Sequence, residues 1–348
     1  MFQTNLHFED LVNIKDWQNI QDSFSEAFDV TVRTFSPEGN PLSEASRPTR
    51  LCKDILSKPS KDHDLCTKCL LDDTIPNIKD IKKDLNIKCH FDLDAFVVPI
   101  RAAGDMIVAY LIVGPMILKR RKDVSEYSKE AKKLGIKLDD LADALIEINV
   151  FSYNKIDAII KLLKQIFSYT AETGYHKKRL GEIRPEVVEL DPLFSRYYEE
   201  KILGSLLNSC TLALGADSGS VMTLDKKTNM LHIKVASKLN DEIVNNTNIK
   251  VGEGIAGLAA QISQPIILPK DENKNGLSGR MRRKYIKSSM IVPFNKGNTH
   301  DLYGVININM VRKNIDFSEK DIALVKELVN MAGIALIPLH QPTPVPKG

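Results

Sequence analysis

Hydrophobic and polar positions follow first a helical and then a strand-like period at the start of this chain. Residues 6–28 carry apolar side chains at every third or fourth position, the spacing of an amphipathic helix. Residues 30–35 then alternate apolar and polar side chains, as a half-buried strand does. Residues 96–100 and 106–113 predict two further strands joined by a short turn that contains a Gly-Asp pair. The pattern therefore predicts a helix followed by antiparallel strands.

The longest helical stripe of the chain lies in residues 153–173, after two shorter predicted helices at 125–134 and 138–148. Its apolar positions are Ile156, Ile159, Ile160, Leu163, Ile166 and Phe167. Such a stripe either packs against the domain that precedes it or forms the seam of a parallel dimer, and the sequence leaves both open. The polar residues 174–190 follow it and predict a domain boundary.

The helix-then-strand pattern restarts in the second half. A helix is predicted over residues 192–214 and a closing helix over 318–337. The strands predicted between them are residues 218–224, 230–237, 265–268, 289–294 and 302–310. Helices and antiparallel strands in both halves predict an α+β fold with two domains, each an antiparallel sheet flanked by helices and joined by the long helix.

Composition and charge narrow the class of protein. The 348 residues are 43% hydrophobic and 27% charged, which is typical of a folded globular protein. A net charge of +3 is too small to indicate a nucleic-acid-binding surface. The apolar residues 106–118 are too few to span a bilayer, and the first residues lack the pattern of a secretory signal. We therefore expect a cytoplasmic protein that contacts neither nucleic acid nor membrane.

Several motifs in the second half occur in the order and at the spacing of one family. They are Val251–Ala259, which is glycine-rich, Lys287–Phe294, Leu302–Ile308 and Phe317–Asp321. Residues 191–338 resemble a GAF domain in these stretches. The resemblance implies a small-molecule sensor domain or a dimerisation module. We expect the last residues, 339–348, to form a loose tail.

The first half resembles the PocR sensory domain over residues 6–170, with 171–190 as the linker. The resemblance rests on Lys88–Ile100, which is similar to a "cys-his-x-gly-leu" motif leading into "val-pro-ile", and on the hairpin that follows. It implies a PAS-related domain that senses small hydrocarbon derivatives such as propanediol. Asp92 stands where the family usually has glycine. The ligand-binding residues that we expect are His90, Phe91, Asp92, Phe96, Pro99 and Gly114.

Most of the cysteines lie in the first half, namely Cys52, Cys66, Cys69 and Cys89. Cys66 and Cys69 form a Cys-x-x-Cys pair, and such thiolates are typical ligands of zinc or an iron–sulfur cluster. The same residues are also compatible with reduced, packed thiols or with a redox-sensing dithiol. All of these alternatives remain open from the sequence.

Enzymatic and cofactor motifs are missing from the sequence. It holds no Gly-x-Ser-x-Gly elbow, Walker loop or His-Glu-x-x-His motif, so we expect no catalytic centre. Cys210 falls on a predicted helix rather than at a chromophore-attachment position, and neither bilin nor haem is expected. Phe317 and Asp321 match the cyclic-nucleotide pattern of GAF domains, but Ile322 replaces its glutamate, which disfavours such a ligand.

The sequence thus predicts a sensor that binds diols or short acids in its first domain. The second domain would relay the bound state to a downstream protein such as a kinase or a transcription regulator, within a homodimer. A thiol- or metal-based redox sensor and a dimerisation scaffold that binds no ligand are the alternatives.

Overall fold

A computed structural model describes residues 7–56, 80–118, 120–183, 192–269, 285–297, 299, 301–312 and 315–340. The chain divides into two compact units, with the division between Tyr175 and His176. Each unit has its own sheet and its own core, and each is described by itself below. The predicted α+β class is confirmed, because antiparallel sheets flanked by helices occur in both units.

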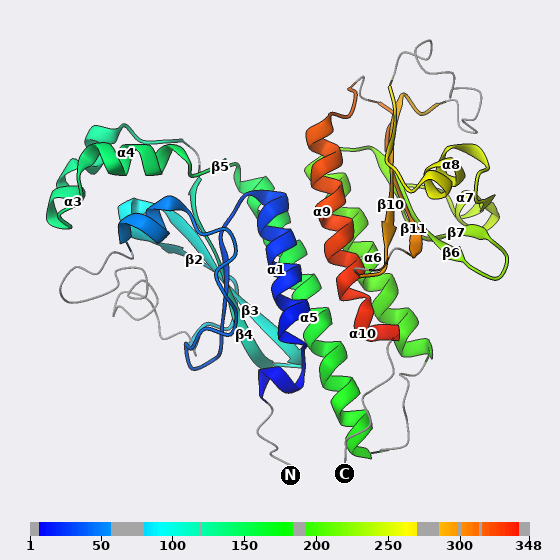
Figure 1. The fold of residues 1–348 in the computed structure, drawn as a ribbon, viewed down its shortest axis with the longest axis horizontal. Helices are drawn as coiled ribbons and strands as arrows, with labels where there is room; N and C mark the ends of the chain where they lie inside the picture. The colour runs from blue at the N-terminus through cyan, green and yellow to red at the C-terminus, as the bar shows by residue number, and fades with distance from the viewer. Residues whose placement is uncertain are drawn as a thin grey trace. The chain divides into compact units, whose positions relative to one another are not determined.

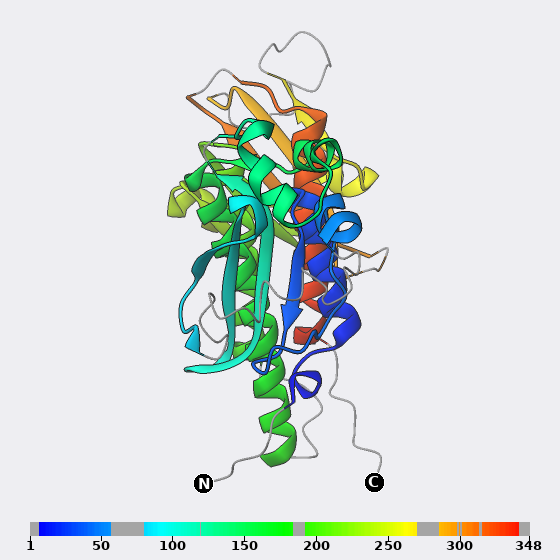
Figure 2. The same ribbon diagram turned by 90° about the vertical axis from the view of Figure 1, so that its left-hand side faces the viewer.

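The first unit is built on an antiparallel sheet with the strand order β1-β4-β3-β2. Its long central pair, β3 and β4, is drawn in cyan in Figure 2. A short strand, β5, pairs with β4 in parallel. The strands are β1 (Val32–Phe35), β2 (Leu85–Lys88), β3 (Asp94–Ala103), β4 (Met106–Leu118) and β5 (Val150–Phe151).

Helices α1 (Ile14–Phe28) and α5 (Tyr153–Ile183) lie side by side in this unit (Figure 1). The contact is aromatic, because the rings of Trp17 and Phe167 pack edge to face with their centroids 4.4 Å apart. The indole N–H of Trp17 donates to the Thr34 hydroxyl on β1 at 2.9 Å, which ties α1 to the sheet. Two shorter helices, α3 (Ser128–Lys133) and α4 (Leu138–Ile146), also belong to this unit, together with the short helical segment Leu51–Leu56.

The apolar stripe of α5 packs into the core of the first unit. All of its predicted members are at most 5% exposed, from Ile156 to Phe167. The stripe is therefore not an exposed dimer seam, and the first of the two uses left open by the sequence is the correct one. The helix also continues beyond the predicted end at Thr173 and runs to Ile183.

The second unit contains an antiparallel sheet of strand order β8-β7-β6-β11-β10-β9. Its strands are β6 (Ser218–Asp225), β7 (Met230–Ser237), β8 (Asn248–Lys250), β9 (Ile266–Leu268), β10 (Ser288–Asn295) and β11 (Leu302–Met310). All of the predicted strands of this half are present, and β8 is an additional edge strand.

Helices cover both faces of the second sheet (Figure 1). On one face lie α6 (Pro192–Ala213), α9 (Glu319–Ala335) and the short α10 (Ile337–His340). On the other face lie α7 (Asp241–Asn246) and α8 (Gly254–Ile262).

The residues Glu319–Leu339 are long and apolar enough to cross a membrane by length and composition. Within the part of the chain that the structure describes, they form the helix α9 and the start of α10, whose apolar side chains pack on the second sheet. Val325 and Leu328 are fully buried there. A core helix of a folded domain accounts for this composition.

Candidate functional site

A cavity of about 170 Å³ lies in the second unit between the sheet and the helices α7 and α8. Its apolar walls come from both layers and include Met222, Ile291, Ile255 and Leu268. A cavity of this size holds a molecule of a few non-hydrogen atoms, or several waters.

The glycine-rich segment before α8 sets one wall of this cavity. Gly252 and Gly254 have φ of +89° and +61°, a backbone conformation that glycine adopts without steric cost. A Cβ at Gly257 would lie 2.3 Å from the Lys250 carbonyl oxygen, so only glycine permits the close approach of α8 to β8. The result places Ile255 and Ala256 at the cavity. The glycines therefore shape the pocket through packing.

Hydroxyl and amide side chains form the floor of the cavity. Ser220 lies on β6, Ser289 on β10, and Asn307 and Asn309 on β11. The Ser289 hydroxyl donates to the side-chain carbonyl of Asn309 at 2.7 Å, and the Asn307 amide donates to the Ser220 hydroxyl at 3.4 Å. Among the described lining residues none carries a charge. The floor can therefore both donate hydrogen bonds to an uncharged polar molecule and accept them from it.

The sequence motifs did not single out these polar residues, although the alternation of residues along β11 indicates them. Asn307 and Asn309 alternate with Ile306 and Ile308 along one strand, so one face of the strand is apolar and the other is polar. Asn309 is nevertheless only 4% exposed. Because α8 covers this face of the strand, its polar side chains face a cavity and not the solvent.

The residues expected to bind ligand in the first unit are distributed over different faces of its fold. His90, Phe91 and Asp92 form one short turn. Phe96 and Pro99 are three residues apart on β3, so their side chains lie on opposite faces of the sheet. The structure thus brings His90, Phe91 and Asp92 together, but it places the side chains of Phe96 and Pro99 apart. The ligand-binding role of the whole set stays a prediction.

Asp92 occupies a backbone position that favours glycine. Its φ is +57°, and that of the buried Phe91 beside it is +59°. The carboxylate of Asp92 lies 2.5 Å from the Lys122 ammonium and 3.4 Å from that of Lys88. The hydrogen bond from Lys122 and the charge of Lys88 lower the pKa of Asp92 against the opposing effect of burial. The left-handed backbone is a physical reason why glycine is usual at this position. The ion pairs with Lys88 and Lys122 stabilise the aspartate that replaces it.

Gly114 is required by packing. Its φ is +136°, and a Cβ there would lie 2.9 Å from both Cα and Cβ of Ala95 on the neighbouring strand. We therefore assign Gly114 to the close approach of β3 and β4, whatever ligand contact it also makes.

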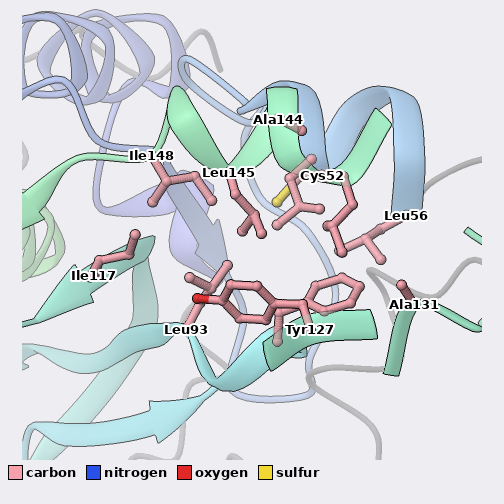
Figure 3. Close-up of a cluster of buried hydrophobic side chains, with 12 residues drawn as sticks. Cys52, Leu56, Leu93, Ile117, Tyr127, Ala131, Ala144, Leu145 and Ile148 are labelled. Carbon is pink, nitrogen blue, oxygen red and sulfur yellow. The ribbon is translucent and has the colours of Figure 1, made fainter. Parts of the chain in front are cut away.

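Two of the predicted metal ligands, Cys66 and Cys69, lie outside the described residues. Cys52 and Cys89 belong to one apolar cluster, in which Cys52 is buried and Cys89 partly buried. Figure 3 shows the Cys52 sulfur beside Ala144 and Leu145, in the same cluster as Leu93 and Tyr127. Over the residues that the structure describes, no three side chains of His, Cys, Asp or Glu are grouped so as to hold a metal ion. The metal site therefore stays a prediction.

Cys210, on α6, is fully buried in the second unit. Burial raises the pKa of its thiol well above the usual range. Because the thiolate is the reactive form, Cys210 is suited to packing and not to nucleophilic or redox chemistry.

Two family models match the chain. Residues 10–175 match the one described as "Sensory domain found in PocR". Residues 199–337 match the one described as "GAF domain". No curated protein matches the chain.

Solved structures similar to the chain include two GAF domains of phosphoenolpyruvate-protein phosphotransferases. The one from Acinetobacter is 18% identical, with 53% of this chain and 94% of that chain covered and a TM-score of 0.36. The one from Coxiella burnetii is 20% identical, with 51% and 92% covered and a TM-score of 0.35. The free methionine-R-sulfoxide reductase of Neisseria meningitidis, in complex with its substrate, is 15% identical, with 42% and 87% covered and a TM-score of 0.33.

Proposed function

We propose that this chain is a signal-transduction sensor that binds a small uncharged organic molecule in its GAF domain. The chain consists of a PocR sensory domain at residues 10–175 followed by a GAF domain at residues 199–337. The observation that carries the proposal is the cavity whose floor is made of Ser220, Ser289, Asn307 and Asn309. A few convergent polar groups in an otherwise apolar cavity are what fix the orientation of a small ligand.

The chemistry of the cavity favours diols, small alcohols and amides over ions. A charged ligand would lose its hydration and gain no opposite charge from the described lining residues, which costs far more than burying a hydroxyl with its hydrogen bonds made. The amide of Asn309 donates and the hydroxyl of Ser220 accepts, so a molecule with adjacent hydroxyl groups satisfies both.

For the PocR domain we propose binding of a second small hydrocarbon derivative, a diol or a short acid, at the turn that carries His90. The ligand state would pass through α5 and the GAF domain to a partner such as a kinase or a transcription regulator, within a homodimer. Support for this relay is the position of α5, whose apolar stripe is in the PocR core and whose last turns enter the GAF half of the chain. In this proposal the protein has no catalytic role.

A thermal-shift screen with diols, alcohols, amides, short acids and nucleotides tests the sensor function. We expect uncharged compounds with two hydrogen-bonding groups to raise Tm. If no compound in the screen raises Tm, the proposal of a scaffold that binds no ligand replaces the sensor.

Hydrogen exchange with and without the stabilising compound tests the relay. We expect slower exchange in β10 and β11, which carry the cavity floor, and a change in Tyr153–Thr173 of α5. Unchanged exchange in α5 at saturation would refute the relay while leaving ligand binding intact.

A thiolate metal site is the second function that we propose, because Cys52 and Cys89 pack on one apolar cluster although they are far apart in the sequence. With Cys66 and Cys69, the set would supply the four thiolates of a closed zinc or iron–sulfur site. Elemental analysis of protein purified without chelator should find roughly one equivalent of zinc or more of iron per chain. A metal-free chain with full secondary structure would refute this proposal.

A further inference from the structure

A second cavity of the GAF domain, of about 490 Å³, lies where the sheet ends at the turn between β10 and β11. Its apolar wall is formed by Leu224, Leu302 and Ile337. The polar part of the lining consists of two ammonium groups, one carboxylate and two hydroxyl-bearing side chains, those of Lys226, Lys296, Asp301, Thr299 and Tyr303. It shares no described lining residue with the cavity above the serine and asparagine floor. It is therefore a separate site with a different chemistry.

The backbone that carries Lys296 is clamped to α9. The N–H of Gly297 donates to the Gly333 carbonyl oxygen at 2.9 Å. A Cβ at Gly333 would lie 2.4 Å from the carbonyl oxygen of Asn295, and a Cβ at Gly297 would lie equally close to Ile337, at 2.4 Å. These close contacts hold the backbone at Lys296 against α9, so its side chain starts from a packed position, which lowers the cost of ordering it on binding.

The other charges around this cavity already have partners. Lys226 pairs with Asp301 at 2.8 Å. Glu199 pairs with Lys234 at 2.9 Å, and it also accepts the hydrogen bond of the Tyr303 hydroxyl. Neither carboxylate forms an ion pair with the Lys296 ammonium among the described residues, although the charge of Glu199 acts on it from a greater distance.

Lys296 makes no hydrogen bond and no ion pair through its ammonium with any residue that the structure describes. Burial lowers its pKa, and the charge of Lys226 adds to this effect while that of Glu199 opposes it. A half-buried ammonium that has lost water and gained no partner is destabilised in its charged form. An anion bound beside it would remove that penalty, so the site favours a negatively charged ligand.

We propose that this cavity binds a small organic anion, with the carboxylate or phosphate group on Lys296 and the apolar part against Leu302 and Ile337. The proposal goes beyond the sensor function above, because it adds a second ligand class at a second site. A GAF domain with both sites would report an uncharged molecule and an anion separately.

Calorimetric titration of the full chain with matched probes of one chain length tests this site. The probes are hexanoate, hexyl phosphate, hexanol and hexylamine. We expect one or both of the anions to bind, and hexanol and hexylamine to bind at least about tenfold more weakly, since a hydrogen bond to a charged group is worth that much.

The variants Lys296→Met and Lys227→Met identify the binding group. Lys296→Met keeps an unbranched side chain one atom shorter and removes its charge, and we expect it to weaken anion binding by about tenfold or more. Lys227 is exposed in the neighbouring turn, so Lys227→Met should leave the affinity unchanged. A control titration with Asn309→Leu, whose altered side chain lies in the other cavity, should also leave it unchanged.

The proposal is overturned if neither anion binds, if hexanol binds as tightly as the tighter-binding anion, or if Lys296→Met retains the wild-type affinity for that anion. It is also overturned if Asn309→Leu, and not Lys296→Met, abolishes binding of the anion. Thermal melts of each variant show that the fold is intact before affinities are compared.

Discussion

The carboxylate of Asp92 lies 2.5 Å from the ammonium of Lys122, although the backbone of Asp92 has a φ of +57° that disfavours most side chains. The ion pair is half exposed, and such pairs stabilise a protein by about 0–1 kcal/mol. The left-handed backbone costs a side chain about 1–2 kcal/mol, with less for aspartate and asparagine. The two effects are of similar size and opposite sign.

Substitution of Asp92 tests this balance. We expect Asp92→Gly and Asp92→Asn each to change the free energy of unfolding by less than about 1 kcal/mol. Asp92→Val should destabilise the PocR domain by about 1–2 kcal/mol more than Asp92→Gly, because a β-branched side chain resists positive φ. Urea unfolding measures these differences, and a valine variant as stable as the glycine variant would contradict the strained backbone.

The ion pair of Asp92 also predicts a dependence of stability on pH. Its pKa is lowered in the folded protein, chiefly by the hydrogen bond from Lys122. In the unfolded chain the Asp92 carboxylate takes up its proton at a higher pH, about 3.9. The stabilisation by the ion pair is therefore fully present above pH ~3.9 and is lost as the pH falls through the lower pKa of the folded protein. Wild type should lose its small advantage over Asp92→Asn on acidification below about pH 4. A difference between the two proteins that is the same at neutral and at acidic pH would contradict the lowered pKa.

Gly114 and Gly104 form a matched pair for the packing of β3 and β4. Gly114→Ala should destabilise the PocR domain by ~2–4 kcal/mol, because the methyl group would collide with Ala95 and the φ of +136° is unfavourable. Gly104 also has a positive φ, +52°, but nothing lies within 4 Å of its Cβ position. Gly104→Ala should therefore cost only about 1 kcal/mol. Equal losses for the two variants in urea unfolding would show that backbone conformation, and not the contact with Ala95, makes Gly114 necessary.

Cys210 should resist alkylation in the native protein. Burial raises the pKa of its thiol, and iodoacetamide reacts with the exposed thiolate. Mass spectrometry should find Cys210 unmodified in native protein and fully modified in denaturant. Native modification of Cys210 would mean that the core around α6 opens or that the thiol has a chemical role.

Much of the fold could be predicted from local sequence, and particular contacts explain the differences. The helix predicted from residue 6 begins at Ile14, because the Asn13 side chain accepts hydrogen bonds from the N–H groups of Lys15 and Asp16 and caps it there. The predicted end of the long helix α5, near Gly174, is wrong for a different reason, because the helix continues to Ile183. A Cβ at Gly174 would lie 1.6 Å from the Leu11 carbonyl oxygen, so this glycine allows a close contact within a continuing helix.

The candidate site was harder to predict than the fold, because it depends on residues that meet only in three dimensions. Ser220 lies on β6, far in the sequence from Ser289 and Asn309 on the consecutive strands β10 and β11, and each of the three is unremarkable alone. The cysteines and His90 stood out in the sequence because they are rare and close together. Rare residue types such as cysteine can be recognised in a sequence as candidate reactive or ligating groups. The floor of a cavity depends instead on strand register and on the helices that cover the sheet, which a single motif does not reveal.

The central claim, that the GAF cavity binds an uncharged ligand, is tested most directly by calorimetric titration of the best diol or amide into wild type, Asn309→Leu and Met310→Leu. Met310 follows Asn309 on β11, and its side chain is on the opposite face of the sheet, so it serves as the matched control. We predict that Asn309→Leu weakens binding by about tenfold, since it removes the carbonyl and the amino group of the Asn309 amide from the floor, and that Met310→Leu binds as wild type does. Binding that is unchanged in Asn309→Leu would contradict the account.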